Sequence, residues 1–220
     1  MAKKKLIAAP SILSADLGRL EQEIQECRTA GASFLHYDIM DGHFVPNITF
    51  GPDFIKRFSK EGMFNDVHLM IDDPLKYAAK CINFGADLIT FHLEAVDDPI
   101  ETQEMIRQFS PKIKVGISIK PRTPIEKILP FLNHFDLVLV MSVEPGFGGQ
   151  QFIISSLDKI RRLRKYIDDQ KLNTLIEVDG GINAETIEMV REAGVDVAVA
   201  GSYIFKSSDK REAIKTIIGA

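Results

Sequence analysis

Short apolar stretches alternate with longer amphipathic stretches along the chain. Each short stretch is rich in branched side chains, as buried strands are, and each is followed by apolar positions at helical spacing. The predicted strands are residues 6–9, 34–39, 67–70, 88–91, 115–119, 137–141, 175–178 and 197–200. The predicted helices are residues 17–31, 52–58, 74–84, 100–109, 125–132, 157–167, 185–193 and 209–218.

Strand–helix units repeated in this order predict a parallel sheet whose outer face is covered by helices. Eight such units close a (β/α)8 barrel, the TIM barrel, and no linker or low-complexity segment interrupts them. The competing fold is a doubly wound open sheet, which needs a glycine fingerprint after its first strand, where this chain has Pro10-Ser11-Ile12-Leu13. We therefore expect an α/β fold with a single (β/α)8 barrel domain over residues 1–220.

Composition and charge narrow the class of protein. The chain has 220 residues, with 27 lysine and arginine residues against 31 aspartate and glutamate residues. This balance predicts no nucleic-acid partner, because a nucleic-acid footprint needs clustered positive charge. No apolar run resembles a signal peptide or approaches the roughly 20 residues that span a bilayer, so we expect a cytoplasmic protein without membrane contact. Cys27 and Cys81 lie in helical patterns without ligand spacing and are expected to be buried thiols.

Polar residues gather at the carboxyl ends of the predicted strands, where barrels of this kind place their active sites. The second strand ends in His36-Tyr37-Asp38, the third in His68, and the seventh in Glu177-Val178-Asp179. Alternation along a strand places His36 and Asp38 on one face, and Glu177 and Asp179 on one face. We expect His36, Asp38, His68 and Asp179 to meet at the mouth of the barrel.

Two imidazoles and two carboxylates suit a borderline divalent cation, and we predict one Zn²⁺, Fe²⁺, Mn²⁺ or Co²⁺ ion per subunit. The alternative for any single histidine is a hydrogen-bonded core residue. That alternative is weaker for the four groups together, because buried carboxylates without partners are costly. His92, at the end of the fourth strand, either supports this site or is structural.

Glycines follow three consecutive strands. The segment Pro145-Gly146-Phe147-Gly148-Gly149-Gln150 comes after the sixth strand, Gly180-Gly181 after the seventh, and Gly201-Ser202 after the eighth. Glycine lets backbone N–H groups approach an anion closely, so these loops favour a phosphate site over three unrelated tight turns. The candidate phosphate-site residues are Gly146, Gly148, Gly149, Gly180, Gly181, Gly201 and Ser202.

Further candidates for substrate contact lie at other strand ends. Met40, Met70 and Met141 stand at or just past the second, third and sixth strands, where they are either core filler or a polarisable wall around a reacting centre. Ser11, after the first strand, either donates a hydrogen bond to a substrate oxygen or caps the turn. With His68, these residues form the expected inner wall of the substrate site.

These segments together resemble the ribulose-phosphate 3-epimerase family. The matching segments are APSILSAD at 9–16, HYDIMDGHFVPN at 36–47, DVHLM at 66–70, VEPGFGGQ at 143–150 and EVDGG at 177–181. They occur in the family's order, and the resemblance covers essentially the whole chain. It implies interconversion of D-ribulose 5-phosphate and D-xylulose 5-phosphate, a phosphorylated ketopentose pair of the pentose phosphate pathway.

The resemblance also assigns roles to individual residues. It implies that His36, Asp38, His68 and Asp179 bind the metal, that Asp38 and Asp179 are the acid–base pair, and that Ser11 contacts the substrate. The residues that would line the phosphate site are Gly148, Gly149, Gly180, Gly181, Gly201 and Ser202. Because family members generally associate, it implies a homo-oligomer. One departure is Lys120, where many members have asparagine, which leaves the charge near the mouth open.

Three other functions compete with this interpretation. Within the family, allulose 6-phosphate is an alternative substrate, because the chemistry at C3 is the same and only the pocket length differs. A barrel lyase acting on a sugar phosphate is disfavoured, because His68 stands where related lyases carry the lysine of an Asp-x-Lys motif. A non-catalytic binder of phosphorylated sugars would leave the paired carboxylates without a purpose.

Overall fold

The computed structural model describes residues 4–220, and eight parallel strands form one sheet in it. The strands are β1 (Ile7–Pro10), β2 (Phe34–Met40), β3 (Phe64–Met70), β4 (Leu88–His92), β5 (Lys114–Ile119), β6 (Leu137–Met141), β7 (Leu175–Asp179) and β8 (Val197–Ala200). They are ordered β1-β8-β7-β6-β5-β4-β3-β2. Between β1 and β2 the described residues form only the isolated bridge Ser11–His36, which nearly closes the sheet into a barrel.

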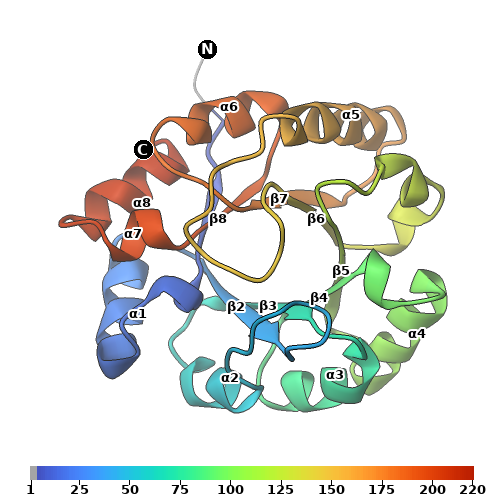
Figure 1. Ribbon diagram of the computed structural model, residues 1–220, viewed down its shortest axis with the longest axis horizontal. Coiled ribbons are helices and arrows are strands. Elements are labelled where there is room, and N and C mark those ends of the chain that lie inside the picture. Colours follow the sequence, from blue (N-terminus) through green and yellow to red (C-terminus); the bar gives the residue numbers. More distant parts are fainter. Residues whose placement is uncertain (1–3) are drawn as a thin grey trace.

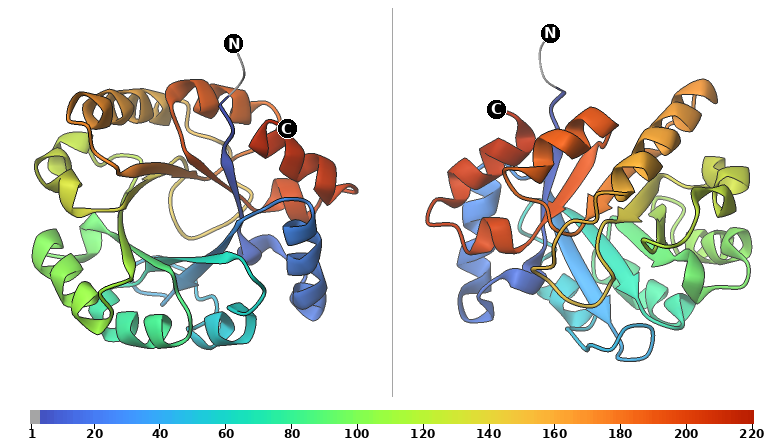
Figure 2. Two further views of the ribbon diagram at one scale, coloured as in Figure 1. Left: turned by 180° about the vertical axis from the view of Figure 1, so that it is seen from behind. Right: turned by 45° about the horizontal axis from the view of Figure 1, so that its top comes forward.

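Helices surround the ring of strands (Figure 1, and from behind in Figure 2). They are α1 (Leu20–Thr29), α2 (Asp53–Phe58), α3 (Pro74–Asn83), α4 (Pro99–Phe109), α5 (Ser156–Asp169), α6 (Thr186–Ala193), α7 (Ser202–Phe205) and α8 (Lys210–Ile218). Short 3-10 helices lie at η1 (Ile12–Ser14), η2 (Leu17–Arg19) and η3 (Leu93–Ala95). The predicted (β/α)8 barrel is confirmed.

The prediction of an α-helix over residues 125–132 is wrong. Two 3-10 helices, η4 (Ile125–Lys127) and η5 (Leu129–His134), connect β5 to β6 instead. Pro130 lies in the first turn of η5. Proline has no N–H to donate and its ring clashes with the carbonyl four residues earlier, so a continuous α-helix cannot pass through Pro130.

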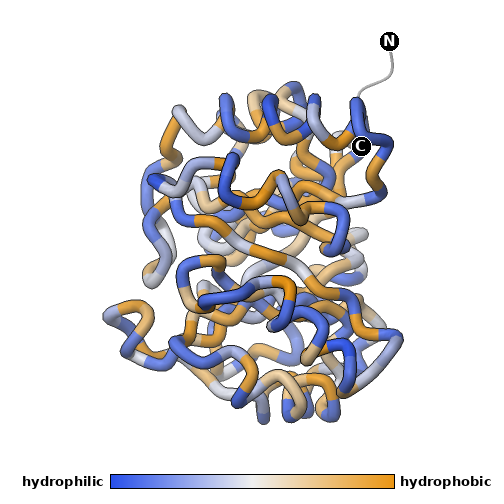
Figure 3. The backbone as a smooth tube through the Cα atoms, turned by 90° about the vertical axis from the view of Figure 1, so that its right-hand side faces the viewer, coloured by the Kyte–Doolittle hydropathy of each residue, from blue (hydrophilic) through white to orange (hydrophobic). Residues whose placement is uncertain are grey.

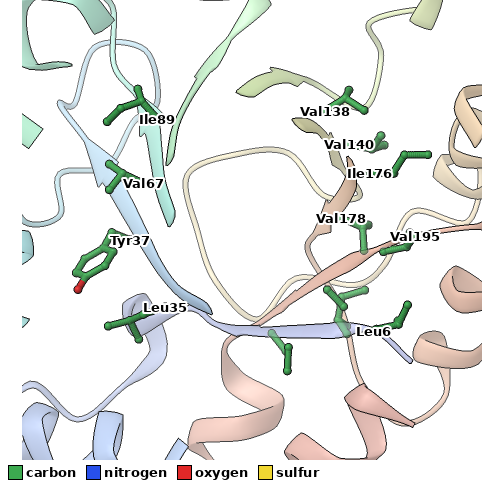
Figure 4. Packing of buried hydrophobic residues seen from close by; sticks show 14 of the residues in the cluster. Leu6, Leu35, Tyr37, Val67, Ile89, Val138, Val140, Ile176, Val178 and Val195 are labelled. Atoms are coloured by element: carbon green, nitrogen blue, oxygen red, sulfur yellow. The ribbon is translucent and has the colours of Figure 1, made fainter. Parts of the chain in front are cut away.

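Alternation along the strands divides the core into two parts. Outward-facing residues such as Val67, Ile89 and Val138 pack under the helices (Figure 4). Each helix contributes a buried stripe, which in α5 includes Ile160 and Leu163. Inside the ring a second cluster fills the barrel with Ala9, Leu88, Leu137, Leu139, Met141, Val143, Val197 and Val199. Hydrophobic and hydrophilic residues consequently alternate at short intervals along the chain (Figure 3).

Two further predictions concern the cysteines and the membrane. Cys27 and Cys81 are both free and buried, as predicted. No helix among residues 4–220 is both long and apolar enough to cross a membrane.

Candidate active site

A cavity opens at the carboxyl ends of the strands, and its walls come from the ends of β2 and β3 and from the loops after β1, β6, β7 and β8. The residues singled out from the sequence that line it are Ser11, Asp38, Met40, Met70, Met141, Gly146, Gly148, Gly149, Asp179, Gly180, Gly181, Gly201 and Ser202. His36 and His68 do not reach the cavity surface, because both are fully buried against Asp38. The fold therefore brings all of the predicted site residues to one end of the barrel.

Asp38 is the centre of a cluster of buried polar groups. Its Oδ1 lies 3.4 Å from Nε2 of His36 and 3.3 Å from Nδ1 of His68. Its Oδ2 accepts a hydrogen bond from Ser11 Oγ at 2.5 Å. Strand register sets these positions, because Asp38 on β2 pairs with His68 on β3.

Asp66 fixes the orientation of the His36 ring. Its Oδ2 lies 2.6 Å from His36 Nδ1, and both side chains are fully buried. This short contact indicates that Nδ1–H donates to Asp66, so that Nε2 points toward Asp38. His36 Nε2 has no hydrogen-bond partner in the described part of the chain. Burial alone would lower the pKa of His36, but Asp66 and Asp38 raise it well above its usual range, so the cluster favours a positive charge here.

The donor atoms fit a divalent metal ion. One possible ligand atom from each of four residues lies within 4.8 Å of the other three, and the four residues are His36, Asp38, His68 and Asp179. Neighbouring ligand atoms on a tetrahedral zinc ion lie about 3.4 Å apart, close to the spacing from Asp38 Oδ1 to the two histidines. The unpartnered, buried His36 nitrogen is a second sign that this cluster is suited to a cation.

Glu177 lies deeper in the barrel, below Asp179 on the same face of β7, as alternation predicts. It is fully buried, and neither carboxylate oxygen has a hydrogen-bond partner among the described residues. Burial, and then the charge of Asp66, raise the pKa of Glu177 well above its usual range. Glu177 also lies near His36 and Asp66, but the 2.6 Å contact between those two is a hydrogen bond rather than a pair of metal ligands.

The pKa values of the two aspartates at the cavity are shifted in opposite directions. Burial would raise the pKa of Asp38, but the charge of the neighbouring His36 holds it well below its usual range. Although an edge of Asp179 reaches the cavity, burial and then the charge of Asp38 raise the pKa of Asp179 to about 7. A bound cation would lower the pKa of both carboxyls.

The glycines after β7 are required by close backbone contacts. Gly181 has a φ of +66°, and a Cβ there would lie 2.5 Å from the backbone nitrogen of Phe152. Ser142 Oγ donates to the carbonyl oxygens of Asp179 at 2.9 Å and Gly180 at 2.7 Å, which holds the turn. The backbone after β7 is thus exposed to the cavity without side chains in front of it.

The loop between β6 and α5 crosses the middle of the ring in Figure 1. Gln150 Nε2 donates to the carbonyls of Glu144 at 2.7 Å and Phe147 at 2.8 Å and so closes this loop on itself. Asn47 Nδ2 donates to the Gly146 carbonyl at 2.8 Å, which joins the loop after β2 to the loop after β6.

Sequence reasoning missed Asp66 and Gln150. Asp66 had a usable signal, because it stands two residues before His68 on one strand and must share its face. Gln150 had none, since its partners are backbone carbonyls of its own loop. Lys120, the departure from the family pattern, does not line the cavity. Its Nζ lies 3.9 Å above the ring of Phe44.

Comparison with known proteins settles the family. The model of the ribulose-phosphate 3-epimerase family matches residues 7–205. The chain belongs to this family. It is 47% identical over 212 residues to the ribulose-phosphate 3-epimerase of Mycobacterium bovis, covering 96% of this chain and 91% of the relative. It is 44% identical over 214 residues to the enzyme of that name from Bacillus subtilis, covering 96% of this chain and 98% of the relative.

Solved structures of other barrels share the fold at low sequence identity. A 3-hexulose-6-phosphate synthase has a TM-score of 0.68 at 19% identity, over 98% of both chains. A tryptophan synthase A-subunit from Pyrococcus furiosus has a TM-score of 0.69 at 15% identity, over 100% of both chains. Because the relatives above are named ribulose-phosphate 3-epimerase, the allulose 6-phosphate alternative is not favoured.

Proposed function

We propose that the protein epimerises D-ribulose 5-phosphate to D-xylulose 5-phosphate at C3, with Asp38 and Asp179 as the two acid–base groups. The observation that carries this proposal is that the two carboxylates come from β2 and β7 and face one cavity, with ligand atoms within 4.8 Å. Family membership supports the same reaction.

Inversion at C3 requires that one group removes a proton from one face and another group delivers a proton to the opposite face. The neighbouring ketone at C2 acidifies the C3 hydrogen, and its loss gives an enediolate. Asp38 and Asp179 reach the cavity from strands that are not neighbours in the sheet, so they can flank the sugar. Ser11 holds Asp38 in place through its hydrogen bond to Oδ2.

We propose that His36, Asp38, His68 and Asp179 hold one divalent ion per subunit. The two-nitrogen, two-oxygen donor set suits Zn²⁺, Fe²⁺, Mn²⁺ or Co²⁺. When bound, such an ion would supply Lewis-acid stabilisation of negative charge on the substrate oxygens. His36 and His68 contribute by presenting their nitrogens from fully buried, oriented rings.

The phosphate of the substrate is proposed to lie against the glycine loops after β6, β7 and β8. These loops line the cavity at Gly148, Gly181 and Gly201 and offer backbone N–H groups. Since the chain carries a net charge of −4, anion binding must depend on such local groups. A phosphate held there keeps C3 in register with the carboxylates, while Met40 and Met70 form the apolar wall.

Replacement of either carboxylate tests the proposal. In Asp38→Asn or Asp179→Asn the missing base should slow exchange of the C3 proton with deuterated solvent by at least about 10²-fold, which is the usual contribution of a general base. Proton NMR of the ketopentose phosphate measures this exchange. Asp158→Asn is the control, because Asp158 is an exposed residue of α5 paired with Arg161. Near-normal exchange in either folded active-site variant would refute the two-base assignment.

Location and assembly are also proposals. Two free, buried cysteines are typical of a reducing compartment, which supports the cytoplasm. Met105 and Phe109 lie one helical turn apart on α4 and are both exposed, which supports self-association of this single-domain chain. Light scattering would measure the number of copies in solution.

A further inference from the structure

His92 has no part in the acid–base chemistry proposed above, yet it contacts one of the proposed metal ligands. Its Nε2 lies 2.9 Å from Nε2 of His68, and its Nδ1 lies 3.3 Å from Oε2 of Glu94. Both imidazoles are fully buried, whereas the Glu94 side chain is 23% exposed. The three side chains form a continuous relay from the cluster around Asp38 to the loop after β5.

The chemistry of the three groups fixes which atom donates and which accepts in each hydrogen bond of this relay. A neutral imidazole has one N–H donor and one acceptor nitrogen, whereas an ionised carboxylate only accepts. Glu94 therefore requires a proton on Nδ1 of His92, which leaves Nε2 of His92 as an acceptor. His68 must then donate from its own Nε2, so that its Nδ1 carries a lone pair and no proton.

The opposite direction of hydrogen-bond donation is unfavourable. It would place the unprotonated Nδ1 of His92 against the carboxylate of Glu94, so that two acceptors face each other at 3.3 Å. Burial would raise the pKa of Glu94, but hydrogen bonds from His92 and Thr123 lower it to about 2, so Glu94 is ionised. The 2.9 Å contact between the two Nε2 atoms further requires that one of them carries a lone pair, because two N–H groups cannot face each other.

The directed relay leaves two acceptors facing each other at the other end. Nδ1 of His68 and Oδ1 of Asp38 lie 3.3 Å apart. With a lone pair on each atom this contact is repulsive, unless a cation lies between them. The relay is thus matched to a metal ion at the cluster around Asp38.

Glu94 is itself held by groups from a different part of the chain. Its Oε1 accepts from the backbone N–H of Lys120 at 2.9 Å and from the hydroxyl of Thr123. Lys159, on α5, donates to the carbonyls of Lys120 at 3.1 Å, Pro121 at 2.5 Å and Thr123 at 2.5 Å. The lysine is half-buried and fixes the loop that receives Glu94.

An aromatic ring, that of Phe44, covers His92 and explains the position of Lys120. The Phe44 ring lies 4.8 Å from the ring of His92, centroid to centroid. The Lys120 ammonium lies on that Phe44 ring, 3.9 Å from its centroid. Phe44 therefore shields His92 from water, and Lys120 packs on the ring of Phe44.

We propose that His92 and Glu94 are positioning residues that hold His68 as its Nε2–H tautomer, so that Nδ1 stays free to bind a metal ion, and that Lys159 anchors the relay from α5. This inference rests on the metal site of the proposed function. It adds three residues, none of which contacts the reacting carbon.

The test measures the His68 tautomer and metal affinity separately. Two-dimensional ¹⁵N–¹H NMR of the metal-free protein reports which ring nitrogen carries the proton, and competition with a chelator gives the dissociation constant for Co²⁺. In His92→Leu the acceptor is gone, so we expect a mixture of His68 tautomers and about 10–100-fold weaker Co²⁺ binding. His92→Gln keeps an acceptor and a donor and should recover most of the affinity.

Two lysine substitutions on α5 distinguish the loss of the Lys159 hydrogen bonds from the general loss of a positive charge. Lys159→Met should weaken Co²⁺ binding in the same direction but less than His92→Leu does. The matched control is Lys165→Met on the same helix, since Lys165 is exposed and paired with Asp169. Its Co²⁺ affinity should equal that of the wild type.

A folded His92→Leu protein with the wild-type tautomer and wild-type Co²⁺ affinity would overturn the relay. If His92→Leu does not fold, Glu94→Gln decides the question by the same two measurements, because it removes the charge that directs the relay. If the wild type binds no Co²⁺ at one ion per chain, the proposed metal site fails. The tautomer in the metal-free protein then still shows whether the relay exists.

Discussion

Gly181 is the most tightly constrained single position at the cavity. Its positive φ favours glycine, and the backbone nitrogen of Phe152 occupies the space that any Cβ would need. Backbone cannot move aside as a flexible side chain can. The close approach therefore connects the turn after β7 to the segment before α5, both of which line or support the proposed phosphate site.

At the residue scale we predict that Gly181→Ala weakens both folding and phosphate binding. Strain at this position should lower the free energy of unfolding by about 1–3 kcal/mol, as measured by urea denaturation. Inorganic phosphate should also protect the variant less against unfolding. Gly51→Ala is the control, because a Cβ at Gly51 meets nothing within 4 Å. Equal effects of the two substitutions would contradict this account.

At the element scale, an aspartate stands directly before each of the strands β4, β6 and β8. Asp87 Oδ2 accepts from the backbone N–H of Asn65 at 2.8 Å, at the preceding strand β3. Asp136 Oδ2 accepts from Val115 N–H at 2.9 Å, and Asp196 Oδ2 accepts from Ile176 N–H at 2.8 Å. The same carboxylate clamp thus joins three pairs of neighbouring strands at their amino ends.

The clamp at Asp136 should make stability depend on pH. Burial would raise the pKa of Asp136, but hydrogen bonds from Val115 N–H and Lys114 and the charge of Arg107 lower it. The folded state then binds fewer protons than the unfolded state near pH 4. The stabilisation is complete above the unfolded pKa of about 3.9 and is lost as pH falls through the lower folded pKa.

We therefore expect Asp136→Asn to cost about 1–3 kcal/mol at pH 7 and much less below pH 3. Urea denaturation of both proteins across this range measures the difference. Asp158→Asn serves as control, because its side chain is 78% exposed. A deficit in Asp136→Asn that stays constant from pH 7 to pH 3 would show that the carboxylate charge is not responsible.

At the scale of the whole molecule, the barrel has a seam between β1 and β2, where few backbone contacts join the two strands. Only the Ser11–His36 bridge joins these strands within the described residues. Of the proposed metal ligands, His36, Asp38 and His68 lie on β2 and β3 at one side of the seam, and Asp179 lies on β7 at the other. A metal ion held by all four would brace the barrel across its least hydrogen-bonded junction.

Metal binding should accordingly stabilise the fold. At a free Co²⁺ concentration of 100 times the dissociation constant, linkage adds about 2.7 kcal/mol. For a chain of this size that raises the melting temperature by about 5–10 °C, which calorimetry measures, and a strong chelator should reverse it. In Asp179→Asn most of the shift should vanish. An undiminished shift in that variant would place the ion elsewhere.

Local patterns explain why much of this protein could be predicted. Strand alternation placed His36 beside Asp38 and Glu177 below Asp179, and the count of strand–helix units gave the barrel. One local feature was misread: Pro130 interrupts the apolar pattern of residues 125–132, and the structure has two 3-10 helices there. The roles of the site residues stay predictions that the variants above test.

The sequence by itself determined the order of the elements, the buried face of each, and the strand ends at which polar side chains gather. These features follow from periods of two and 3.6 residues, which are properties of a single segment. Only the tertiary structure decided that His68 meets His92 and that Glu94 receives the loop at Lys120. Such contacts join residues 24 and 26 positions apart on different strands and loops. They depend on strand register and on closure of the ring, which no single segment encodes.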